Sequence, residues 1–126
     1  MKNGKFVILC VDDDQDLLDS MRIILESRGY AVETASSAQE GLRLFKSVQP
    51  DLLIVDLMME EVDSGATLVR DLRALGVKLP PIYMLSSVGD GLSQNIDFSE
   101  LGLTGVLQKP INPDSLARTL AAQLKA

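Results

Sequence analysis

The sequence predicts a doubly wound α/β fold, in which a five-stranded parallel sheet carries five helices distributed over both faces. Three observations support this prediction. Five short apolar segments alternate with amphipathic helical patterns along the 126 residues. The strongest apolar segments lack the polar and apolar alternation of a half-exposed strand, as expected for parallel strands that are covered on both faces. Strands that alternate with helices also require crossover connections, which are right-handed in such sheets.

The apolar segments are the predicted strands. Strong runs occupy 6–11, 51–56 and 81–86, and weaker runs occupy 30–34 and 104–108. Each run has five or six residues, which is the usual length of a strand. Asp12 follows the first strong run and Asp56 ends the second, so the sequence places carboxylates where buried strands finish.

Helical patterns lie between these runs and after the last one. Gly29 and Gly76 are predicted to end the first and third helices. The segment 90–101 offers few residues for packing, and we expect a short or mobile fourth helix there. Apolar residues at helical spacing define the buried stripes of the other four. The stripes are Leu17, Leu18, Met21, Ile24 and Leu25; Leu42, Phe45 and Val48; Leu68, Val69, Leu72 and Leu75; and Leu116, Leu120 and Leu124.

Polar residues mark the starts of three helices. Ser37 and Glu40 have the spacing of a capping box. Asn112 is followed by proline, which is typical of an N-cap and the first helical position. Asp14 is predicted to cap the first helix, and Asp16 would lie in its first turn, where the helix dipole favours a negative charge.

The composition of the chain excludes several classes of binding partner and active site. The length fits a single domain over 1–126, and the net charge of −6 opposes binding to nucleic acid or to anionic membranes. No apolar stretch is long enough for a transmembrane helix. The chain has no histidine, which excludes imidazole zinc sites, Ser-His-Asp triads and phosphohistidine carriers within it. Its one cysteine, Cys10, cannot form an intrachain disulfide, so we expect a core role for it and a cytoplasmic setting.

Reactive or ionic groups follow four of the five predicted strands. Ligands bind at the carboxyl ends of strands in open α/β sheets, so we expect these groups to form one site. Three aspartates without a nearby base suit a hard cation such as Mg²⁺, while a lysine and a hydroxyl could contact phosphoryl oxygens. These parts indicate phosphoryl transfer to a carboxylate nucleophile. The groups are Asp12 and Asp13, then Asp56, then Ser86 and Ser87, and finally Lys109.

Each of these residues also has an ordinary structural interpretation. Asp13 or Asp14 could simply cap the first helix, and Asp56 alone would usually be a turn residue. A pair of serines is a common loop entry, and an exposed Lys-Pro step is usually a turn. Co-location on one edge of one sheet is what favours a functional site.

In this order and on this alternating pattern, the chain resembles a response-regulator receiver domain of two-component signalling, from Phe6 to about Leu124. The residues that carry the resemblance are the acidic pair Asp12 and Asp13, Asp56 at the end of DLLIVD, Ser86, and Lys109 before Pro110. The resemblance implies a flavodoxin-like sheet with strand order 2-1-3-4-5. It also implies a phosphoprotein that changes a partner-binding surface and catalyses only its own phosphorylation and dephosphorylation.

The resemblance assigns roles by position. Asp56 would accept the phosphoryl group, and Ser86 and Lys109 would contact it. Mg²⁺ would be held by Asp12, Asp13 and Asp56 and by the backbone carbonyl of Met58. The implied donor is a sensor histidine kinase or a phosphotransfer protein, and the implied acceptor of the signal is an output protein or domain. The domain would be a monomer or a phosphorylation-dependent dimer, either standing alone or as a piece of a longer regulator.

The sequence departs from the usual receiver pattern at three places. Glu60 replaces a proline after the phosphoacceptor, so we expect a differently shaped, more acidic loop. Val106 stands where many receivers have the aromatic residue of the switch. Met58 and Val88 are apolar where polar side chains could orient an attacking water, which predicts a comparatively long-lived acyl phosphate.

Two other functional classes share some of these features. A small Mg²⁺-dependent phosphatase often has a D-x-D pattern after its first strand, and Asp12 and Asp14 match that spacing. Such an enzyme needs a cap or substrate pocket, for which 126 residues leave little room. A flavodoxin-like electron carrier needs a hydroxyl-rich phosphate loop, and the sequence has none.

Overall fold

The computed structural model describes residues 4–56, 64–87, 103–109 and 111–124. Strands and helices alternate over the described residues up to 87, as predicted, and a fifth strand and a further helix follow over 103–124. The strands are β1 (Val7–Val11), β2 (Ala31–Ala35), β3 (Leu52–Asp56), β4 (Ile82–Ser87) and β5 (Gly105–Lys109). The helices are α1 (Gln15–Ser27), α2 (Ala38–Val48), α3 (Ser64–Ala74) and α5 (Pro113–Gln123). The fourth helix predicted over 90–101, like Met58, Glu60 and Val88, lies outside the described residues.

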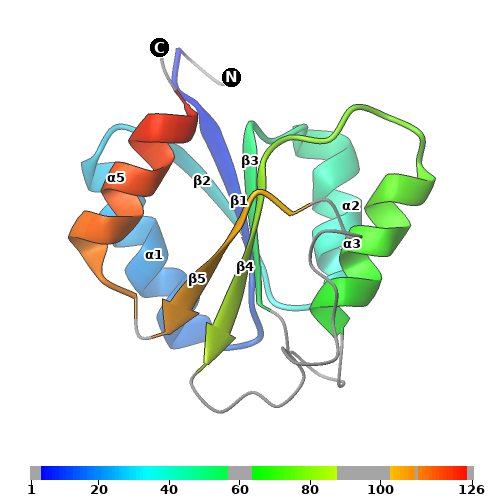
Figure 1. Cartoon of the computed structure of the whole chain (residues 1–126), viewed down its shortest axis with the longest axis horizontal. Coiled ribbons are helices and arrows are strands. Elements are labelled where there is room, and N and C mark those ends of the chain that lie inside the picture. The colour runs from blue at the N-terminus through cyan, green and yellow to red at the C-terminus, as the bar shows by residue number, and fades with distance from the viewer. Residues whose placement is uncertain (1–3, 57–63, 88–102, 110, 125–126) are drawn as a thin grey trace.

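The five strands form one parallel sheet in the order β2-β1-β3-β4-β5, which confirms the predicted topology. The order reverses between β1 and β3, because the chain first builds β2 on one side and then returns to the other. The strands run in one direction, so all their carboxyl ends meet at the lower edge of the sheet in Figure 1. This edge carries the residues that the sequence singles out.

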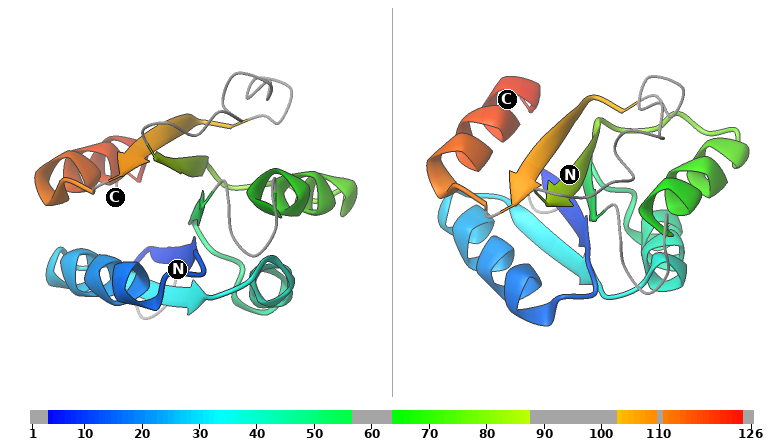
Figure 2. Two further views of the ribbon diagram at one scale, coloured as in Figure 1. Left: turned by 90° about the horizontal axis from the view of Figure 1, so that it is seen from below. Right: turned by 60° about the horizontal axis from the view of Figure 1, so that its bottom comes forward.

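The helices cover both faces of the sheet. Figures 1 and 2 show α1 and α5 on one face and α2 and α3 on the other. Every residue of β1 and β3 is buried, in agreement with the uniformly apolar runs, and alternate residues of each strand enter the two cores. Fully burying a large apolar side chain stabilises the fold by roughly 1.5–3 kcal/mol. Cys10 is 1% exposed in the α1 and α5 core, which confirms the packing role expected for it.

Caps hold the helices at the predicted residues. The Asp14 carboxylate accepts a hydrogen bond from the backbone N–H of Leu17, and Asn112 accepts one from Ser115. Ser37 accepts from the N–H of Glu40, but the Glu40 carboxylate accepts from Ser36 rather than from the cap residue itself. The capping box is therefore shifted by one residue on its acidic side.

Two details differ from the sequence prediction. Leu75, assigned to the buried stripe of the third helix, follows the end of α3 and is 38% exposed. The helix stops one residue earlier than its apolar pattern suggests, and Gly76 then adopts a left-handed conformation with φ of 73°. On β5, burial alternates because this strand lies at the edge of the sheet, and Val106 is exposed.

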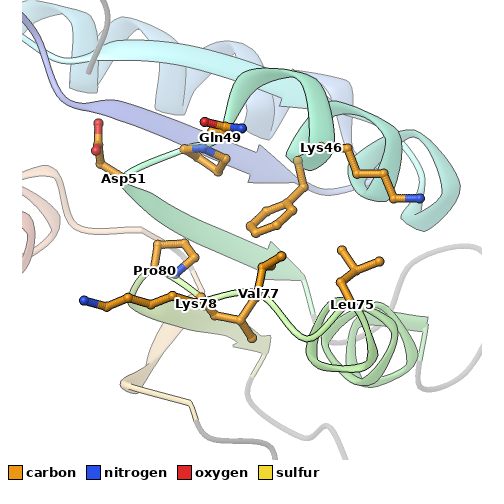
Figure 3. Close-up of a pocket in the computed structure, with 10 residues that line it drawn as sticks. Lys46, Gln49, Asp51, Leu75, Val77, Lys78 and Pro80 are labelled. Carbon is orange, nitrogen blue, oxygen red and sulfur yellow. The ribbon is translucent and has the colours of Figure 1, made fainter.

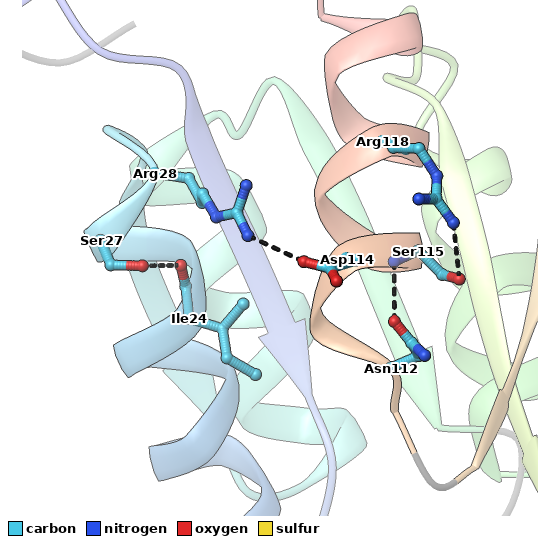
Figure 4. A network of polar contacts seen from close by, with 7 residues as sticks. All are labelled: Ile24, Ser27, Arg28, Asn112, Asp114, Ser115 and Arg118. Carbon is cyan, nitrogen blue, oxygen red and sulfur yellow. Dashed lines mark hydrogen bonds and ion pairs between the residues drawn. The ribbon is translucent and has the colours of Figure 1, made fainter.

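A polar contact joins the two helices on one face. Arg28, which caps the C-terminus of α1, lies with its guanidinium 3.2 Å from the carboxylate of Asp114 in the first turn of α5 (Figure 4). Both side chains are exposed, so the pair adds at most about 1 kcal/mol to stability.

Within the described part of the chain, no helix is both long enough and apolar enough to cross a bilayer.

We expect Gly105→Ala to destabilise the protein by about 1–3 kcal/mol, because overpacking displaces neighbouring groups. A Cβ atom at this position would lie 2.8 Å from Cε1 of Tyr83, which pairs with Gly105 across β4 and β5. Urea unfolding monitored by circular dichroism measures the change.

The double variant Gly105→Ala with Tyr83→Leu tests the cause. Removing the ring removes the overlap, so the double variant should be more stable than the sum of the two single effects predicts. Strict additivity would contradict the steric explanation.

Candidate functional site

The sheet brings the ends of β1, β3 and β5 to one edge. Asp12 follows β1, and its backbone N–H donates a hydrogen bond of 3.0 Å to the carbonyl of Ala35 at the end of β2. Asp56 ends β3 and Lys109 ends β5. The parallel register thus places residues that are up to 97 positions apart in the sequence within contact of one another.

Three carboxylates form a cluster at this edge. Asp12, Asp13 and Asp56 each offer a carboxylate oxygen, and these atoms all lie within 4.8 Å of one another. Asp12 and Asp56 are buried, with 1% and 5% of their surfaces exposed, whereas Asp13 is exposed. The fold therefore brings the three predicted acidic residues together, with two of them buried and one exposed to solvent.

Lys109 reaches this cluster from β5. Its ammonium nitrogen lies 3.1 Å from Oδ2 of Asp12 and 3.2 Å from Oδ1 of Asp56. Burial lowers the pKa of Lys109, but its contacts with the two carboxylates outweigh that effect and hold the pKa above the usual value for a lysine. The side chain is therefore a fixed positive charge between two buried negative charges.

The carboxylate of Asp12 is held by the start of α1. Its Oδ1 atom accepts a 2.9 Å hydrogen bond from the backbone N–H of Asp14, the residue whose own side chain caps the helix. Sequence reasoning missed this contact, although the N-cap signal at Asp14 marks the turn that makes it. One short segment therefore fixes both the helix and the orientation of Asp12.

The second oxygen of Asp12, Oδ2, is buried, and its one partner among the described residues is the Lys109 ammonium, 3.1 Å away. A buried carboxylate oxygen is normally hydrogen-bonded or bound to a cation. Together with the oxygen-only donor set of Asp12, Asp13 and Asp56, this atom fits a hard divalent cation such as Mg²⁺. Met58, predicted to add a carbonyl ligand, lies outside the described residues.

Ser86 lies on the strand next to Asp56. Residue 85 of β4 is the register partner of Asp56, so Ser86 follows one position beyond it toward the carboxyl edge. Ser86 is buried, with 5% of its surface exposed. Its register partner on β5 is Gln108, and the next pair along is Ser87 and Lys109. The hydroxyl-bearing strand therefore lies between the two strands that supply Asp56 and Lys109.

The geometry suits a reaction at Asp56 in which negative charge accumulates. A cation held by these carboxylates and the Lys109 ammonium, 3.2 Å from Oδ1 of Asp56, would together offset the negative charge of a phosphoryl group at this edge. Cys10 offers no competing nucleophile, because burial raises the pKa of its thiol to about 12. A buried thiol of this kind is protonated and unreactive at neutral pH.

Comparison with known proteins identifies the sequence family. Residues 8–121 match the response regulator receiver domain. The chain is 34% identical over 118 residues to the response regulator MprA of Mycolicibacterium vanbaalenii, and a similar match is found to MprA of Mycobacterium avium. These alignments cover 94% of this chain and 50% of each relative, so the chain spans about half the length of the curated relatives it matches.

Solved structures show the same fold. The chemotaxis protein CheY4 of Vibrio cholerae superposes with a TM-score of 0.84 at 31% identity, covering 96% of this chain and 100% of that protein chain. A response regulator receiver domain protein of Clostridium thermocellum superposes with a TM-score of 0.82 at 29% identity, covering 94% and 93% of the two chains.

We expect Asp13→Asn to lower the affinity for Mg²⁺ by about tenfold, equivalent to about 1.4 kcal/mol, because it removes one of three clustered carboxylates. Asp13 is exposed, so the variant should fold normally. Isothermal titration with MgCl₂ measures the affinity.

Asp71→Asn is the matched control. It removes the same charge from an exposed position on α3, outside the cluster. Equal losses of Mg²⁺ affinity in the two variants would show that net charge alone controls binding and would contradict the site.

Proposed function

The chain belongs to the response regulator receiver domain family, the regulatory domains of two-component signalling, and from this we propose that it accepts a phosphoryl group on Asp56. The observation that carries the proposal is the arrangement of charge around that residue. Asp56 is buried at a strand end, 3.2 Å from the Lys109 ammonium and within 4.8 Å of the carboxylate oxygens of Asp12 and Asp13.

In the proposed reaction an Asp56 oxygen attacks the phosphorus atom of a phosphohistidine. A P–O bond forms and the P–N bond breaks, which leaves an acyl phosphate on this chain and a neutral imidazole on the donor once that ring is protonated. Residues 1–126 contain no histidine, so the phosphohistidine must lie outside them. A sensor histidine kinase or a phosphotransfer protein has the required chemistry.

Asp12, Asp13 and Asp56 would hold Mg²⁺, with the Met58 carbonyl as the fourth protein ligand. The ion would offset the charge repulsion between an anionic nucleophile and an anionic phosphoryl group. Asp12 is oriented for this task by the Asp14 N–H, and its second oxygen is buried, with the Lys109 ammonium 3.1 Å away. Lys109 would hold a phosphoryl oxygen while remaining close to Asp56.

Receiver domains act as regulatory switches rather than as enzymes that turn over a substrate. We therefore propose that phosphorylation changes a surface recognised by an output protein or domain. Ser86 would meet the phosphoryl group from the neighbouring strand. Val106, two positions before Gln108 on β5, is 39% exposed and supplies no aromatic ring for the switch. The output surface of this chain would therefore respond to phosphorylation without that ring.

We further propose a cytoplasmic setting for the chain.

Acetyl phosphate with Mg²⁺ should add one phosphoryl group, about 80 Da, to the native chain and none to Asp56→Asn, because the amide is not a nucleophile. Intact-mass spectrometry measures the product. Asp71→Asn, with the same charge change, should be labelled like the native chain. Labelling of Asp56→Asn would contradict the assignment, and release of many phosphates per chain would indicate a phosphatase.

The apolar side chain of Met58 should prolong the lifetime of the acyl phosphate. Met58→Asn should shorten it by about tenfold, since a polar side chain two residues after the phosphoacceptor can orient an attacking water. Loss of the added mass with time measures the decay. A native half-life of seconds that the substitution leaves unchanged would contradict a protective role for the apolar side chain.

A further inference from the structure

A hollow lies at the edge of the sheet opposite the acidic site. It is enclosed by the connection from α2 to β3 and the connection from α3 to β4, at the amino ends of these strands (Figures 1 and 3). Its volume is about 620 Å³, which lies within the range of ligand-binding pockets. Its apolar lining comes from both connections and consists of Phe45, Pro50, Leu75, Val77, Leu79 and Pro80.

The lining leaves apolar side chains exposed. Leu75 and Val77 are 38% and 53% exposed, and they are two of the four large apolar side chains that remain exposed in the described part of the chain. Single exposed apolar residues need no explanation, but two that face one hollow form a patch. Leu75 continues the otherwise buried apolar stripe of α3 but is itself exposed, so core packing does not explain its identity.

A helix cap and three prolines restrict the backbone of the walls of the hollow. Gln49 caps α2 in a left-handed conformation with φ of 53°, and its N–H donates to the carbonyl of Phe45. Pro50 follows it directly, and Pro80 and Pro81 hold the opposite connection. A hollow with fixed walls costs little conformational entropy when a ligand binds.

The charge around the hollow is opposite to that of the whole chain. Lys46 and Lys78 lie on it, and a neighbouring hollow that shares Val77, Leu79 and Pro80 adds Arg73. The only acidic lining residue is Asp51, and one of its oxygens accepts a 2.8 Å hydrogen bond from the Val7 N–H. Among its described lining residues, two lysines against one aspartate give this hollow a charge of +1 on a chain of net charge −6.

The two lysines extend away from each other. In Figure 3 the side chains of Lys46 and Lys78 leave the hollow at opposite ends, with Leu75, Val77 and Pro80 between them. An occupant that meets both lysines must be elongated, apolar in the middle and acidic at its two ends. A compact molecule with one acidic group would satisfy only one lysine.

We propose that this hollow, formed by residues 45–51 and 75–80, binds a short segment of a partner protein that carries apolar side chains between acidic ones. The apolar side chains fill the space beside Leu75 and Val77, and the flanking carboxylates pair with Lys46 and Lys78. The surface lies at the opposite edge of the sheet from Asp56, so binding does not require phosphorylation. A second copy of this chain is a poorer fit, because two chains of charge −6 repel.

The test is selection of displayed random 12-residue peptides on the unphosphorylated native chain. The probe for affinity is each enriched peptide, synthesised and measured by fluorescence anisotropy. We expect enriched sequences with apolar residues flanked by Asp or Glu. Val77→Glu should weaken their binding by at least about tenfold, and Lys46→Glu and Lys78→Glu should each weaken it about threefold or more, with a loss that grows as salt is lowered.

Matched controls separate the hollow from general surface effects. Ile23→Glu places the same charge on an exposed apolar position of α1, 69% exposed, and Arg118→Glu reverses an exposed charge on α5. Neither should change the affinity by more than about twofold. All five variants change exposed positions, and circular dichroism melting confirms that each is folded.

Three outcomes would overturn the proposal. The first is enrichment of peptides without acidic residues, or of peptides that bind Val77→Glu as well as the native chain. The second is binding of decanoate that Val77→Glu abolishes while no peptide is enriched, which would indicate a site for small anionic amphiphiles. The third is a concentration-dependent dimer in sedimentation that Val77→Glu abolishes, which would make a second copy the occupant.

Discussion

Burial of two carboxylates at neighbouring strand ends is the constraint on which the site depends. Two ionised carboxylates about 4 Å apart repel by about 1 kcal/mol in water and by about 4 kcal/mol at an effective dielectric constant near 20. Asp12 and Asp56 are both buried, so their repulsion must be offset within the protein. The ammonium group of Lys109, 3.1 Å from one and 3.2 Å from the other, supplies part of that offset.

The order of the strands explains why residue 109 is a lysine. β5 is the edge strand and β4 separates it from β3, so the group that ends β5 must reach past the end of β4. Neighbouring strands are about 4.8 Å apart, so β5 lies about 9.6 Å from β3, and only a long side chain can span that distance and keep its charge beside Asp56. The same span couples the edge strand to events at Asp56, because any new anion there competes for the Lys109 ammonium.

The sequence predicted most of the fold because its signals are local and agree with one another. Uniformly apolar runs could only be strands buried on both faces, and β1 and β3 are buried throughout. Asp14, Ser37 and Asn112 are caps at the helix starts where the sequence places them. The strand-end rule then placed Asp12, Asp56 and Lys109 together without any knowledge of distances.

What the sequence could not predict depends on contacts between segments that have no periodic pattern. Leu75 continues the apolar stripe of α3, yet the helix ends before it, since a local pattern cannot tell whether a neighbour will cover its last residue. The bond from the Asp14 N–H to Asp12 and the ion pair of Arg28 with Asp114 likewise arise only from the three-dimensional arrangement. The hollow beside Val77 is built from two connections, for which residue spacing gives no signal.

The two edges of the sheet differ in the sign of their local charge, which the net charge of the chain does not show. The carboxyl edge concentrates Asp12, Asp13 and Asp56 around one lysine, whereas the hollow at the amino edge is lined by two lysines and one aspartate among the described residues. At physiological salt the screening length in solvent is about 8 Å, so the charges at one edge of the sheet have little effect on a molecule that approaches the other. Each edge therefore presents its own sign to an approaching molecule. A cation and a phosphoryl donor suit the first edge, while an acidic segment suits the second, so the two surfaces can be occupied independently.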